Sequence, residues 1–63
     1  MTQEQKQILE TLKEEYRNTL TVAEFEKAKR AIERGDYVIW EGHLLLFKPR
    51  TRIPIAIYLN LFE

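Results

Sequence analysis

Apolar residues recur every three or four positions along the first part of the chain, which is the pattern of an amphipathic helix. Thr2 and Gln5 have the spacing of a capping box, in which the two side chains bond the backbone at a helix start. The sequence therefore predicts a helix over 3–18 with one apolar stripe and a mostly acidic outer surface. The stripe consists of Ile8, Leu9, Leu12 and Tyr16.

A second helix is predicted over 22–34, and its ends are the most clearly marked in the chain. Thr21 and Glu24 form another capping box, and Gly35 follows where a helix commonly ends. One face is apolar and includes Phe25, Ala28 and Ile32, with Val22 and Ala31 at its flanks. The opposite face carries Lys27, Arg30 and Arg34. The short connection between the two helices predicts a helical hairpin.

Beyond Asp36 the pattern changes to runs of aromatic and branched residues, which favour strands. The runs 37–40 and 43–48 flank Glu41 and Gly42, as in a β-hairpin with a two-residue turn. Such a turn pairs Trp40 with His43 and Val38 with Leu45, whereas a bulge at Gly42 would shift the register by one residue. Over 55–61 the branched aliphatic residues alternate with other residue types in a period of two, which favours a third strand; a helix is the alternative.

These elements predict one α+β domain over 1–63 with the order ααβββ, a helical hairpin packed on a three-stranded antiparallel meander. The strands 37–40 and 43–48 are apolar on both faces, but the two helices can cover only one face. The uncovered face would expose apolar side chains of the kind that mark an interface. We therefore expect a homo-oligomer, most simply a two-fold dimer, together with an unidentified protein partner. The candidate interface residues are Tyr37, Val38, Trp40, Leu45, Phe47 and Tyr58.

The composition limits the chemistry available to this chain. Its 63 residues include no cysteine and one histidine, so we expect no disulfide, no metal site and no cofactor. Its longest apolar run is about half the roughly 20 residues that a membrane helix needs, and the first residues do not have the pattern of a secretory signal. A soluble, cytoplasmic protein without a membrane partner is expected.

Charge is balanced overall but unevenly distributed. Ten acidic and ten basic side chains give a net charge of zero, which argues against nucleic-acid binding through overall charge. The segment 48–52 nevertheless combines three cations with Pro49 and Thr51, as a phosphate-contacting loop does. A solvated surface is the alternative explanation. The candidate nucleic-acid contacts are Lys27, Arg30, Arg34, Lys48, Arg50 and Arg52.

The favoured hypothesis is a non-enzymatic interaction protein that binds a macromolecule through an aromatic sheet face or a helix surface. No glycine-rich phosphate loop, nucleophile elbow, paired-histidine metal motif or dinucleotide fingerprint occurs in the sequence. No catalytic residue is therefore assigned.

Two other hypotheses remain open. The basic helix followed by a hairpin resembles the second half of a winged helix, which implies a nucleic-acid-binding protein, such as a transcriptional regulator, with the basic helix face toward DNA. The acidic turn at Glu41 departs from the basic wing of that family. The third hypothesis is a small ribonuclease-like enzyme that uses His43, Tyr37 and the cations of 48–52. It is based on topology alone, since the same order of elements occurs in some RNA-cleaving toxins.

Overall fold

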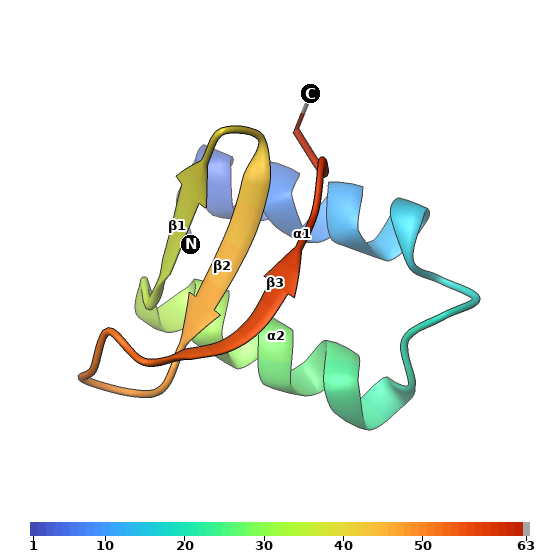
Figure 1. The fold of residues 1–63 in the computed structure, drawn as a ribbon. Helices are drawn as coiled ribbons and strands as arrows, with labels where there is room; N and C mark the ends of the chain where they lie inside the picture. The colour runs from blue at the N-terminus through green and yellow to red at the C-terminus, as the bar shows by residue number, and fades with distance from the viewer. Residues whose placement is uncertain (63) are drawn as a thin grey trace.

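The structure, a computed structural model, describes residues 1–62 as two helices and one sheet in the order ααβββ (Figure 1). The helices are α1 (Gln3–Glu15) and α2 (Val22–Arg34), and the strands are β1 (Tyr37–Trp40), β2 (His43–Phe47) and β3 (Pro54–Tyr58). The strands lie in the order β1-β2-β3, and both neighbouring pairs are antiparallel. The predicted α+β fold is therefore confirmed, and the last element is a strand rather than a helix.

Both helices begin at the capping boxes that the sequence predicts. The Thr2 hydroxyl accepts from the Gln5 N–H at 3.2 Å, and the Gln5 side chain accepts from the Thr2 N–H at 2.7 Å. Thr21 and Glu24 make the same reciprocal pair at the start of α2. The first helix ends at Glu15 rather than at residue 18, because the chain turns there: the N–H groups of Thr19 and Leu20 both donate to the Tyr16 carbonyl.

The core lies between the two helices and one face of the sheet. It contains Ile8, Leu12, Ala28, Ala31, Ile32, Leu44, Leu46 and Leu61. Val22, expected at the flank of the apolar face of α2, is instead 81% exposed. It occupies the first helical position, where its side chain lies outside the helix–sheet layer. Stability of the monomer thus depends on a small set of aliphatic contacts.

The hairpin between β1 and β2 has the two-residue turn. Glu41 and Gly42 both have positive φ, at 49° and 80°, which defines a type I′ turn. Trp40 consequently pairs with His43 and Val38 with Leu45, as the sequence predicts. The register with a bulge at Gly42 is not formed.

The chain leaves the sheet sooner than the sequence suggests. The predicted strand 55–61 ends at Tyr58, and Asn60 has a φ of 54° that bends the backbone. The Asn60 N–H donates to His43 Nδ1 and the Phe62 N–H donates to the Gly42 carbonyl, both at 3.0 Å. The segment 59–62 is therefore fixed against the β1–β2 turn (Figure 1).

Candidate interaction surfaces

The face of the sheet that points away from the helices is apolar and uncovered. Leu44 and Leu46 point into the core, so the residues that alternate with them point outward. The register places Val38, Leu45 and Ile57 side by side across all three strands, while Trp40 and His43 form the neighbouring pair. We call this surface the open face. It consists of Val38, Trp40, His43, Leu45, Phe47 and Ile57.

The side chains at the two edges of the open face are largely in contact with solvent. Trp40 on β1 is 59% exposed and Ile57 on β3 is 53% exposed, while Leu45 between them is half-buried. The Trp40 ring contacts the His43 ring edge-on, with the centroids 6.3 Å apart. None of the six positions carries Lys, Arg, Asp or Glu. The open face is thus a continuous apolar surface with an imidazole and an indole N–H as its only polar side-chain groups.

Two of the six interface candidates lie elsewhere. Tyr37 and Tyr58 belong to the helix-facing side: the Tyr37 hydroxyl donates to Glu4 Oε1 at 2.7 Å, and the Tyr58 ring packs edge-on against Tyr16 at 5.0 Å. Phe47 alternates with Leu46 and so shares the side of Leu45, but it is only 7% exposed, and the Arg52 guanidinium lies 5.7 Å from its ring centroid. Val38, Trp40, Leu45 and Phe47 therefore lie on the open face, and the structure adds His43 and Ile57.

The helix-facing tyrosines make the stability of the fold sensitive to alkaline pH. The Tyr37 hydroxyl donates a hydrogen bond to the Glu4 carboxylate, which raises the pKa of Tyr37 above its ordinary value of 10.0. Burial raises the pKa of Tyr58, and the nearby Glu24 carboxylate adds to that shift. Both shifts favour the protonated phenol in the folded state. Their contribution to stability is therefore complete below pH 10.0 and is lost as the pH rises through the raised pKa values.

We accordingly expect the free energy of unfolding to be level from about pH 8 to pH 10 and to fall above it. Urea titrations followed by circular dichroism at increasing pH measure this dependence. Tyr37→Phe removes one of the two titrating groups and should make the decline shallower. An equally steep decline in Tyr37→Phe and the parent chain would assign the effect to other groups.

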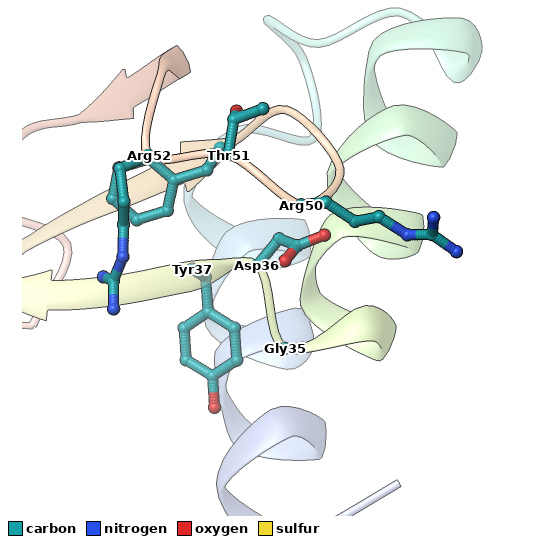
Figure 2. A pocket seen from close by; sticks show the side chains of 7 residues that line it. Gly35, Asp36, Tyr37, Arg50, Thr51 and Arg52 are labelled. Atoms are coloured by element: carbon teal, nitrogen blue, oxygen red, sulfur yellow. The ribbon is translucent and has the colours of Figure 1, made fainter.

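Cations gather at the end of the molecule where α2 meets the loop 48–52. The Phe47 N–H donates to the Asp36 carbonyl at 2.9 Å, and Arg34 Nε donates to Asp36 Oδ2 at 2.8 Å. A hollow of about 450 Å³ opens beside them (Figure 2). It is lined by Gly35, Asp36, Tyr37, Phe47, Arg50, Thr51 and Arg52. Figure 2 shows the Arg50 and Arg52 side chains pointing to opposite sides of this hollow, so they do not converge on one small anion.

The remaining cations of α2 lie in other places. Lys27 lines a separate hollow beside Ile55 and Ala56 of β3, whereas Lys29 lies beside Glu10 of α1. Arg30 is exposed on the outer surface of α2. The two basic segments are therefore linked only indirectly, since Arg34 bonds Asp36, which lines the same hollow as Arg50 and Arg52.

The loop 48–52 has an ordered backbone with an unusual residue at its turn. The Thr51 N–H and hydroxyl both donate to the Lys48 carbonyl at 3.1 Å, and the Ile53 N–H donates to Thr51 Oγ1 at 3.2 Å. Pro49 takes the second turn position, and Arg50 takes the third with a φ of 61°. This left-handed position favours glycine or asparagine, because the Cβ atom of other residues is crowded there. The loop thus holds an arginine at some cost in stability.

The structure brings together only some of the residues that the winged-helix and ribonuclease-like hypotheses require. His43 lies beside the hairpin turn, at the opposite end of β2 from the loop 48–52, so the structure separates it from Arg50, Arg52 and Tyr37. The acidic turn at Glu41 is likewise remote from the basic loop, so it does not extend a basic surface as a wing does. Within residues 1–62 no group of three metal-ligating side chains occurs, and neither helix has the length and apolar character to cross a bilayer.

Comparisons of the chain with models of protein families, with curated proteins and with solved structures find no match. The function is therefore inferred from the surfaces described above.

Proposed function

We propose that this chain is a small non-enzymatic interaction protein that binds a macromolecular partner through its open face. The observation that carries the proposal is the absence of Lys, Arg, Asp and Glu from all six outward positions. An antiparallel sheet with one face in solvent normally alternates apolar and polar residues. A cytoplasmic location is part of the proposal, because a chain without cysteine needs no oxidising compartment.

Burial of a single side chain of the open face would not offset the free-energy cost of association. Fully burying one large apolar side chain contributes about 1.5–3 kcal/mol, and Trp40 and Ile57 are already about half buried. Association costs roughly 4–15 kcal/mol in lost freedom of motion. Several half-exposed side chains must therefore be covered together, and one charge placed among them should disrupt binding.

The experiment compares three immobilised proteins: the parent chain, Ile57→Glu and Val22→Glu. Each is incubated with a cell extract to which untagged parent chain has been added, and the retained polypeptides are quantified. Val22→Glu is the matched control, since it adds the same charge at an exposed aliphatic residue of α2. Polypeptides kept by the parent chain and the control but lost by Ile57→Glu support the proposal. Identical retention by all three proteins would show that the open face is not the binding surface.

A second candidate function, nucleic-acid binding, is favoured by one observation: the left-handed conformation of Arg50. Residues in such conformations are concentrated at functional sites, where the side chain is kept despite the strain. Because Arg50 and Arg52 point apart, they suit two separate phosphates of a polynucleotide better than one small anion.

Arg50→Gly separates a binding role from a purely structural role. We expect this variant to be more stable than the parent chain by about 1 kcal/mol, because glycine relieves the left-handed strain. If the loop contacts phosphate, the same variant should bind mixed-sequence duplex less tightly and with a shallower salt dependence. Fluorescence anisotropy at several salt concentrations measures binding, and urea titration measures stability. Arg17→Gln, in the exposed α1–α2 connection, is the control, and equal binding by both variants would exclude the loop.

A further inference from the structure

We infer that the open face is covered by a second copy of this chain, in a two-fold dimer whose sheets pack face to face. This inference rests on the proposed function of the open face. The helices would form the outer layers of such a dimer and the two sheets its inner layers. Paired sheets of this kind lie about 10 Å apart.

The open face is complementary to itself. A two-fold axis places the same surface of two copies together, so any charged group would meet a like charge or lose its water. No strand position of the open face carries Lys, Arg, Asp or Glu, and the Arg52 guanidinium over the Phe47 ring lies at the end of β2 opposite His43. Its polar atoms belong to Trp40 and His43, which are the last residue of β1 and the first of β2. At this end of the sheet the indole N–H can remain hydrated at the rim of the interface.

The surface area of the chain is consistent with a missing partner. A compact monomer of 7.6 kDa should have an accessible surface of about 4,300 Å². The chain exposes 4778 Å², an excess of roughly 500 Å² over that expectation. Two copies that each covered such an area would bury about 1,000 Å² in total, which is the lower limit for a specific interface. A dimer with a micromolar dissociation constant is therefore expected.

The size of the domain gives an independent reason for self-association. Domains below about 70–80 residues seldom obtain enough stability from one core, and they add disulfides, a metal or a second copy. This chain has 63 residues and no cysteine. Residues 1–62 contain no group of metal-ligating side chains. Association through the open face would give the sheet a second apolar layer, on the side that the helices do not cover.

The test uses the purified full chain alone. Light scattering during size-exclusion chromatography gives the mass, and acrylamide quenching of Trp40, the only tryptophan, reports whether the open face is covered. We expect the mass to double and Trp40 quenching to decrease over the same range of micromolar concentrations. Ile57→Glu should weaken the dimer at least about tenfold, since its charge would lose water at the interface, whereas Val22→Glu should leave it unchanged.

Three results would overturn the inference. A monomeric parent chain throughout the micromolar range excludes the second copy, and the extract experiment then decides whether the open face binds another protein. A dimer in which Trp40 is quenched as in the monomer forms through a surface other than the open face. A dimer unaffected by Ile57→Glu uses another surface, provided that urea titration shows this variant to be folded.

Discussion

Leu12→Ala is expected to remove roughly a third or more of the free energy of unfolding. Leu12 is completely buried between the helices and the sheet, and residues 1–62 contain only nine buried apolar side chains. Replacing a buried leucine by alanine costs about 2.7–5 kcal/mol, because contacts are lost and a cavity remains. A domain of this length is stable by only roughly 3–9 kcal/mol. One substitution in the core of the helix–sheet layer can thus remove half of the stability or more.

Urea titration followed by far-ultraviolet circular dichroism measures this loss. Val22→Ala is the control, since Val22 is apolar and exposed, and its truncation should change the free energy of unfolding by less than about 0.5 kcal/mol. A dimer is stabilised by mass action, so both variants are compared at one low protein concentration. Similar losses for the two variants would contradict the described core.

Local signals in the sequence account for what could be predicted of the fold. Thr21, Glu24 and Gly35 act on the backbone within a few residues of themselves, so they locate α2 without knowledge of the rest. The turn at Glu41 and Gly42 similarly determines the register of β1 and β2. Each of these predictions depends on contacts that are close in sequence.

Which side chains of each strand point toward the helices could not be predicted in the same way. Leu44, Leu45 and Leu46 are identical residues, so no alternation of polar and apolar residues marks which of them points inward. In β3 the large aliphatic residue Ile57 points outward, while Ala56 and Tyr58 face the helices. Hydrophobicity alone would favour the opposite arrangement, and a shift of one residue reverses every side chain of a strand. The residues of the open face are therefore determined by which side of the sheet the helices cover.

The position of the cations could not be predicted either, because it depends on distant segments. Arg34 bonds Asp36, which lines the same hollow as Arg50, whereas Lys27 lines a separate hollow beside β3. These basic side chains lie outside the open face. A sheet-to-sheet dimer would leave them exposed and would present two copies of the basic end on one particle. The two candidate functions are thus compatible, and Ile57→Glu and Arg50→Gly test them separately.

The end of the chain provides the last prediction, since Leu59 and Leu61 have different roles there. A strand continuing over 55–61 would place both leucines on the same face, and their truncation would have similar effects. In the structure the positive φ of Asn60 breaks the alternation: Leu61 is 8% exposed within the core, whereas Leu59 is 62% exposed. We therefore expect Leu61→Ala to cost about 2–4 kcal/mol and Leu59→Ala less than about 0.5 kcal/mol.

Urea titration of the two variants, again at low protein concentration, measures this difference. Hydrogen exchange at Asn60 and Phe62 gives a second measurement, because their N–H groups donate to His43 Nδ1 and to the Gly42 carbonyl. Loss of the Leu61 side chain should release both bonds and accelerate exchange at both amides, while Leu59→Ala should leave their protection intact. Equal costs for the two truncations, with unchanged exchange, would support a continuous strand and contradict the attachment of 59–62 to the hairpin turn. Unequal costs would show that the chain end completes the core, because Leu61 covers apolar residues that the short strand β3 leaves open.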